Sequence, residues 1–150
     1  MTFIQAIASD VLDAAVRLRE VAVRTPFLTS SRLNELAGGK VFVKIESLQH
    51  TGAFKFPGAF NCMSQFQRAD CSYSVSAYSS GNHGQAIATV GKMPRIATTV
   101  VMPSDALAIK VAKARQQGAK VIPFDRIKES QKATAARLGA SGGYPQFATT

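Results

Sequence analysis

The sequence predicts an α/β fold in which a parallel sheet is covered by helices on both faces. Two observations indicate this class. From residue 73 onward, short apolar runs alternate with amphipathic helical patterns in the order βαβαβα. The chain has 150 residues, 46% of them hydrophobic, which is enough apolar material for one core. Strands separated by helices of this length predict right-handed crossovers and therefore parallel pairing.

The first part of the chain carries less regular patterns. Ser9 can cap a helix with one apolar face, and this helix should stop before Thr25, because the residue before Pro26 is pushed out of the helical region. The remaining elements predicted here are a helical turn over 31–37 that ends at Gly38, a strand over 40–46, and a helix over 54–66 with Pro57 in its first turn.

The second part carries the regular alternation. Its predicted strands cover residues 73–77, 96–102 and 120–124, and its predicted helices cover 82–90, 104–117 and 125–138, the last two capped by Ser104 and Asp125. Residues 139–150 predict a loop-like end without a further element. A boundary near residues 68–74 divides the chain into a region 1–70 and a region 71–150.

Composition argues against several function classes. Lys and Arg total 18 against 9 Asp and Glu, a net charge of +9 that favours anionic ligands. The basic residues are scattered and not interleaved with aromatics, which argues against nucleic-acid binding. No apolar stretch approaches the ~20 residues that cross a bilayer, and no leader pattern opens the chain. Cys62 and Cys71 fit neither a disulfide scaffold nor a metal site, so we expect no metal and a cytoplasmic protein.

A polar, glycine-containing segment follows the strand predicted at 73–77. In an open parallel sheet, ligands collect at the carboxyl ends of strands, where Ser79, Ser80, Gly81, Asn82 and His83 lie. Free backbone amides at the start of the next helix attract an anion. The alternative interpretation is an ordinary turn with a capping residue, and the segment alone does not decide between them.

A second polar group lies in residues 51–59, where Lys55 is bracketed by Phe54 and Phe56 with glycines at both ends. An ammonium group pressed into apolar surroundings loses hydration, so a neutral amine that attacks a carbonyl becomes accessible. Such a lysine suits a Schiff base. The alternative is a solvated lysine at the start of an amphipathic helix, with the aromatic rings packed beneath it.

Five blocks resemble one enzyme family in order and spacing over nearly the whole chain. They are TPFL at 25–28, VFVKIESLQ at 41–49, TGAFK at 51–55, SSGNHGQA at 79–86, and the segment from Val101-Met102-Pro103 to Lys110. This pattern is similar to fold-type II pyridoxal-phosphate enzymes, the tryptophan synthase β-like class. The Ser-Ser-Gly-Asn-His form resembles the branch of threonine/serine dehydratases, serine racemases and hydroxyaspartate dehydratases.

The resemblance implies a role for individual residues. Lys55 would form the Schiff base with pyridoxal 5′-phosphate and later remove the Cα proton. Phe54 would pack along the cofactor ring, and Asn82 would hydrogen-bond its 3-hydroxyl oxygen. The segment 79–83 would hold the substrate carboxylate, and in racemising relatives the position of Ser80 supplies the acid-base group on the opposite ring face.

The implied activity is that of a lyase in amino-acid metabolism, which converts L-threonine or L-serine to a 2-oxo acid and ammonia. Serine racemase and hydroxyaspartate dehydratase are the near alternatives. The implied partners are a small amino-acid substrate and further copies of the chain in a homo-oligomer, without a membrane.

The sequence departs from the family in three places. The family has Ser where this chain has Ala53 and Arg where it has Pro57. The glycine-rich loop for the cofactor phosphate lies, in the family, beyond the portion that this sequence matches. Gly139, Gly142 and Gly143 follow a predicted helix, so a C-cap and turn is the better interpretation of them.

The resemblance therefore implies an N-terminal portion of the family fold, in which residues 1–70 lack the later strands that complete their sheet. Apolar faces on the first helix and on residues 41–45 should then be exposed. The rival function of another class is a non-catalytic remnant that acts through protein association.

Overall fold

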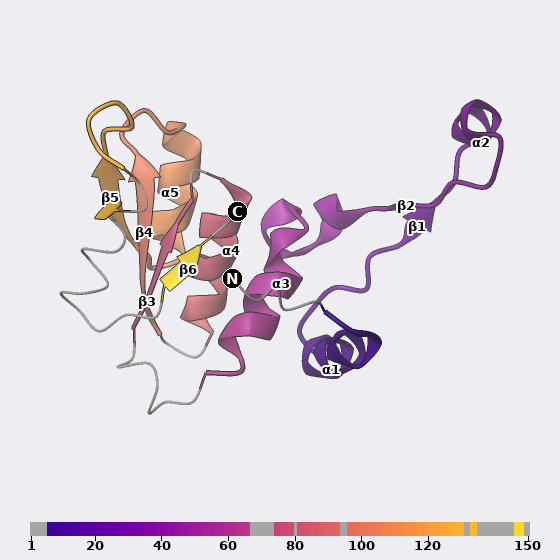
Figure 1. Cartoon of the computed structure of the whole chain (residues 1–150), viewed down its shortest axis with the longest axis horizontal. Coiled ribbons are helices and arrows are strands. Elements are labelled where there is room, and N and C mark those ends of the chain that lie inside the picture. Colours follow the sequence, from indigo (N-terminus) through magenta and orange to yellow (C-terminus); the bar gives the residue numbers. More distant parts are fainter. Residues whose placement is uncertain are drawn as a thin grey trace.

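The computed structural model describes residues 6–66, 74–79, 81–93, 96–130, 133–134 and 146–148. Figure 1 shows a compact part built on a parallel sheet, from which the N-terminal region projects as an arm that ends at α2. The helices are α1 (Ala8–Leu18), α2 (Ser31–Ala37), α3 (Lys55–Met63), α4 (Asn82–Lys92) and α5 (Ala108–Gln116). The strands are β1 (Phe27–Leu28), β2 (Val43–Lys44), β3 (Ser74–Tyr78), β4 (Ala97–Pro103), β5 (Lys120–Phe124) and β6 (Gln146–Ala148), and two 3₁₀ turns, η1 (Glu46–Leu48) and η2 (His50–Gly52), precede α3.

The main sheet has the order β5-β4-β3-β6, and every neighbouring pair is parallel. The predicted alternation of strands and helices is confirmed. Because β3, β4 and β5 are successive neighbours, right-handed crossovers place α4 and α5 on the same face of the sheet, and the two helices contact each other there (Figure 1). Much of the helix predicted for the other face, after β5, lies outside the described residues.

Helix α3 belongs to the same core as β3 and α4. Its buried side chains Phe56, Ala59 and Met63 pack with Val75 and Ala77 of β3 and with Ala86, Ile87 and Val90 of α4. A second cluster lies between α4, β4 and α5 and contains Val100, Met102 and Ala114. The division of the chain at residue 70 stays a prediction, but the first region already contributes a helix to the core of the second.

The arm before α3 has little core of its own. No residue of α1 is buried, and the antiparallel pair β1–β2 has only two residues per strand, too short to be stable by itself. Arg17 Nε on α1 donates a 2.7 Å hydrogen bond to Asn61 Oδ1 on α3 and ties the helix to the compact part. The predicted exposure of apolar side chains is confirmed on α1. In residues 41–45, Phe42 and Val43 are exposed, whereas Val41 and Ile45 are half-buried.

Three predicted helix starts are corrected. Ile7, not Ser9, precedes α1, and its N–H donates to Asp10 Oδ2 at 2.9 Å. The helix predicted from Ser104 begins at Ala108, because Ser104 N–H donates to Phe124 O and the chain turns before it becomes helical. Asp125 does not start a helix; its carboxylate accepts from the N–H groups of Ile127 and Lys128 and caps a turn instead.

Two strand predictions are also corrected. The strand predicted over residues 40–46 is reduced to Val43–Lys44, because only two residues of β1 pair with it. The sequence predicts no element in residues 139–150, yet Gln146–Ala148 forms β6 and pairs with β3, with Phe147 opposite Ala77. Neither of these differences changes the carboxyl edge of β3, where the candidate site lies.

Helix α4 approaches the sheet so closely that only glycine fits at one position near this edge. A Cβ at Gly84 would lie 2.9 Å from Val100 Cγ1, 3.2 Å from Ser79 O and 3.4 Å from Ser79 Cβ. Distances this short cannot be absorbed without moving the helix or the strands. The absence of a side chain at Gly84 therefore sets how near α4 begins to the end of β3.

We expect Gly84→Ala to destabilise the chain by about 1–3 kcal/mol, because the added methyl group overpacks the contact of α4 with β3 and β4. Gly58→Ala is the matched control, since α3 leaves the space around a Cβ at Gly58 free to 4 Å and alanine is the better helix former. Urea unfolding of both variants measures the difference. A Gly84→Ala variant as stable as the Gly58→Ala variant would contradict the packing described.

Candidate functional site

The polar segment after β3 lies where the sequence predicts it, between the carboxyl end of the strand and the start of α4. Ser79 is buried; its N–H donates to Val101 O at 3.1 Å, and its Oγ accepts from Gly81 N–H at 3.2 Å. Ser79 thus also stabilises the turn through its side chain. The two interpretations of this segment, a ligand-binding loop and an ordinary turn, are therefore compatible. Ser80 lies outside the described residues.

The first turn of α4 carries Asn82 and His83. Asn82 is the first helical residue and is exposed to solvent. His83 is half-buried, and its Nε2 is shielded from solvent without a hydrogen-bond partner among the described residues. The leading N–H groups of a helix have no partner within the helix. This turn therefore offers unpaired donors and a free imidazole nitrogen at one place.

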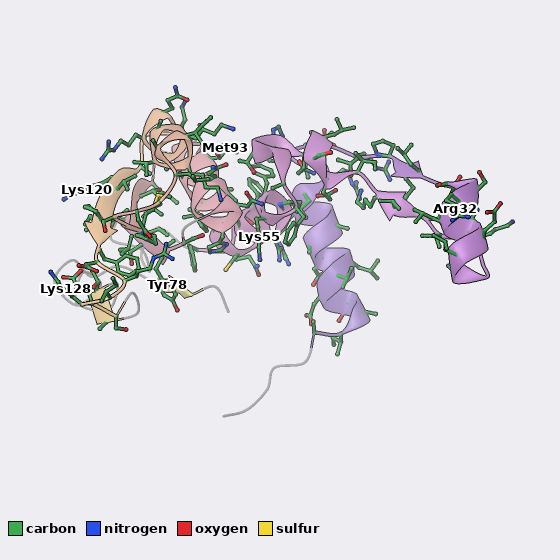
Figure 2. The ribbon with its side chains drawn as sticks, turned by 90° about the horizontal axis from the view of Figure 1, so that it is seen from above. Arg32, Lys55, Tyr78, Met93, Lys120 and Lys128 are labelled. Carbon is green, nitrogen blue, oxygen red and sulfur yellow. The ribbon has the colours of Figure 1, made fainter. Side chains whose placement is uncertain are left out.

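Lys55 is the first residue of α3 and is half-buried. The chain reaches it through a tight turn in which Thr51 and Gly52 both have left-handed φ angles, of 68° and 67°. Lys55 Nζ lies 4.9 Å from the centroid of the Phe54 ring. Of the two phenylalanines that flank Lys55 in the sequence, Phe56 is fully buried in the core, and Phe54 is the ring that contacts the amine. Figure 2 shows Lys55 at the middle of the molecule and Arg32 of α2 at its far end.

Two side chains that the sequence did not single out hold this turn in place. The buried Gln49 side chain accepts from Val23 N–H at 3.1 Å and donates to Val23 O at 3.0 Å. His50 Nε2 lies 2.9 Å from Val21 O, and its ring lies 4.5 Å from that of Phe56, centroid to centroid. Both residues anchor the turn before Lys55 to the segment that follows α1.

The electrostatics place the Lys55 amine near His83. Burial lowers the pKa of His83 from its ordinary value of 6.5, and the positive charge of Lys55 lowers this pKa further. His83 is therefore neutral at pH 7. Because α3 and α4 also pack against each other, we take Lys55 at the start of α3 and His83 at the start of α4 as parts of one candidate site.

A second lysine, not predicted as a site residue, lies at the same loop. Lys110 is in the first turn of α5, is half-buried, and its Nζ would lie 3.7 Å from a Cβ built on Gly81. None of the ion pairs among the described residues involves it. The position of Lys110 shortly after β4 could have indicated that it lies at this loop, because neighbouring parallel strands end at the same edge of the sheet. Lys110 adds positive charge next to the N-terminus of α4.

Two positions where the sequence departs from the family pattern that it resembles lie beside Lys55. Ala53 is buried, and its methyl group brings no polar atom to the turn. Pro57 is half-buried in the first turn of α3, as predicted. Proline is tolerated there because N–H groups of the first turn make no hydrogen bond within the helix. Thr51 Oγ1 nearby is shielded from solvent and has no partner among the described residues. Neither Ala53 nor Pro57 therefore brings a hydroxyl or a charge to this turn.

This arrangement can hold a carbonyl compound with an anionic group. An amine that lies against an exposed aromatic ring can attack a carbonyl carbon, and the flat face of Phe54, which is 61% exposed, can pack on a planar ligand. The amides of the first turn of α4 and Lys110 can bind a carboxylate. The candidate site residues Lys55, Phe54, Ser79, Gly81, Asn82 and His83 come from the facing ends of α3 and α4.

Comparison with known proteins identifies what this chain is similar to. A family model described as "Pyridoxal-phosphate dependent enzyme" matches residues 18–148. L-threo-3-hydroxyaspartate ammonia-lyase of Pseudomonas sp is 46% identical over 134 residues, which cover 89% of this chain and 42% of that protein. Serine racemase of Schizosaccharomyces pombe is 41% identical, with the same coverages of 89% and 42%.

Solved structures show the same likeness. Maize serine racemase superposes with a TM-score of 0.87 at 31% identity, over 95% of this chain and 44% of that one. The T.th. threonine deaminase superposes with a TM-score of 0.81 at 33% identity, over 94% and 44%. The chain therefore spans less than half the length of these relatives.

We expect the pKa of His83 to rise in a Lys55→Met variant, because the variant removes a positive charge and leaves the burial in place. It should still stay below 6.5, since burial is the larger cause. NMR titration of the imidazole protons measures both values, and Lys113→Met, which removes an exposed charge from α5, is the control. A His83 pKa that responds equally to both variants would contradict the proximity of Lys55 and His83.

The same shift predicts how acid affects stability. Because the folded-state pKa is lowered, the unfolded chain takes up the His83 proton first as the pH falls through 6.5. The free energy of unfolding should therefore fall on acidification through this range, and less so in a His83→Gln variant. Urea unfolding at successive pH values measures the difference, and equal acid sensitivity of the two proteins would be the contrary result.

Proposed function

The chain belongs to the pyridoxal-phosphate dependent enzymes, and from that membership we propose that it contributes the cofactor lysine and the substrate-binding loop of an enzyme that eliminates ammonia from a 3-hydroxy amino acid. The family and the fold-type II class that the sequence predicts are confirmed. The observation that carries the proposal is the position of Lys55, which lies against Phe54 and within electrostatic reach of His83.

The described residues fit pyridoxal phosphate at its reactive end. When bound, this cofactor supplies an aldehyde that condenses with an amine and a ring that withdraws electrons from the substrate Cα. Lys55 provides the amine on a half-buried helix start, and Phe54 provides an exposed flat face. Asn82, exposed on α4, provides a carboxamide for the 3-hydroxyl oxygen of the ring.

The chain's own residues then have distinct tasks. Lys55 Nζ would hold the cofactor through its aldehyde carbon and, as a free amine, would accept the proton from the substrate Cα. The amides of α4, with the Lys110 charge close to them, orient the substrate carboxylate. His83 is neutral at pH 7, so its Nε2 can hydrogen-bond the substrate without adding a positive charge beside Lys55. Ser80 stays the predicted acid-base group of a racemase, outside the described residues.

We infer the proposed substrate class from the activities that the names of the similar proteins give. Two L-threo-3-hydroxyaspartate ammonia-lyases, from Pseudomonas sp and Saccharomyces cerevisiae, are 46% and 43% identical to this chain. The L-threonine ammonia-lyase of Thermotoga maritima is 36% identical. These identities support ammonia elimination from 3-hydroxyaspartate as well as from the predicted L-threonine and L-serine. Serine racemisation is the second candidate, supported by the 41% identity of the Schizosaccharomyces pombe enzyme.

Absorbance of the protein with pyridoxal phosphate tests the proposal. We expect a visible band that borohydride bleaches and that Lys55→Ala removes, because the amine of Lys55 makes the covalent link. Lys113→Ala, which changes an exposed lysine of α5, should keep the band. Release of 2-oxo acid and ammonia from 3-hydroxyaspartate, serine and threonine then ranks the substrates. The absence of a band at saturating cofactor, or a band that survives Lys55→Ala, would contradict the proposal.

A further inference from the structure

The segments that form the candidate site carry positive charge without an acidic side chain to balance it. Residues 51–59 and 79–86 contain no Asp or Glu. Between Glu46 and Asp105 the sequence has a single acidic residue, Asp70, which lies outside the described residues. Lys55 and Lys110 take part in none of the ion pairs among the described residues. Unbalanced positive charge of this kind favours an anionic ligand.

Lys110 differs from an ordinary surface lysine. It is half-buried, whereas Lys113 of the same helix is exposed. Its Nζ would lie 3.7 Å from a Cβ built on Gly81, the residue directly before α4. The acidic residue nearest to it in the sequence, Asp105, is paired with Arg126 at 2.9 Å. The ammonium group of Lys110 therefore reaches the loop before α4 with no partner among the described residues.

The sheet explains why Lys110 lies at this loop. Strands β3 and β4 are parallel neighbours, with Tyr78 opposite Val101. Helix α4 follows β3 and α5 follows β4, so both helices begin at the carboxyl edge of the sheet (Figure 1). Gly81 has no side chain that could stand between the ammonium group and the loop. The edge thus brings together the leading N–H groups of α4 and a lysine of α5.

These two kinds of donor can bind different carboxylates. The leading N–H groups of α4, with the neutral His83 beside them, suffice to bind one carboxylate. Serine and threonine have a single carboxylate, so binding them leaves the Lys110 ammonium without an anion of its own. A 3-hydroxyaspartate molecule has a carboxylate at each end. Its second carboxylate can pair with Lys110, and a charge-assisted hydrogen bond of this kind is stronger than a neutral one.

Building on the proposed function, we propose that Lys110 is the residue that makes the site prefer a 3-hydroxy amino acid with a second carboxylate. Its ammonium group binds the side-chain carboxylate of the substrate, while the leading N–H groups of α4 bind the α-carboxylate. Lys110 selects the substrate in this way, whereas the proton transfer stays with Lys55. The preferred substrate is then 3-hydroxyaspartate, ahead of serine and threonine.

Two unreactive probes, L-malate and L-lactate, test this proposal on the chain without cofactor. Both are 2-hydroxy acids without an amine, and L-malate has the additional carboxylate. NMR titration of the backbone amides of Gly81 and Asn82 gives both dissociation constants. We expect L-malate to bind about fivefold more tightly than L-lactate, in the range for one partly exposed charge pair. Lys110→Met should remove this preference and leave the affinity for L-lactate unchanged.

Matched variants separate the possible outcomes. Lys110→Arg should keep the preference because it keeps the charge, and Lys113→Met, which removes an exposed charge from the same helix, should also keep it. Urea unfolding checks that Lys110→Met folds. Equal binding of the two probes, no binding of L-malate, or a Lys110→Met variant that weakens both probes alike would each overturn the proposal. Since no cofactor is present, these results are independent of the Lys55 absorbance band, whose absence would contradict the proposed function instead.

Discussion

The rest of the structure depends on the burial of one face of α3 against β3 and α4. Phe56, Ala59 and Met63 leave almost no surface in solvent, and burial of a large apolar side chain contributes about 1.5–3 kcal/mol. Lys55 directly precedes Phe56, so the packing that fixes the position of Phe56 also fixes the backbone from which the Lys55 side chain extends. The backbone position of the candidate site's lysine therefore follows from the packing of the core.

The same packing places polar and charged groups of the candidate site near the start of α4. Gly84 lets α4 lie close to the end of β3, and His83 Nε2 in the first turn of α4 is shielded from solvent. The tight turn at Thr51 and Gly52 leads into α3. Lys55 and Lys110 bring positive charge near the leading amides of α4, an environment that suits an anionic ligand.

Local patterns were sufficient for the alternating strands and helices of the main sheet. The strand predicted at 120–124 matches β5 without error, and β3, β4 and α4 differ from prediction by a few residues. β6 was missed because its three residues form a strand only through pairing with β3, which lies far earlier in the chain. In the site, Lys55 was predictable from its neighbours in sequence. Gln49 and His50 were not, because their contacts lie 26 and 29 residues away.

The most direct measurement of the central claim is the location of the covalent link to the cofactor. The protein is incubated with pyridoxal phosphate, reduced with borohydride, digested, and mapped by tandem mass spectrometry. If α3 and α4 hold the Lys55 amine as described, the phosphopyridoxyl group is found on Lys55 in preference to the exposed lysines such as Lys113. A label spread evenly over the lysines, or concentrated on Lys110, would contradict the account.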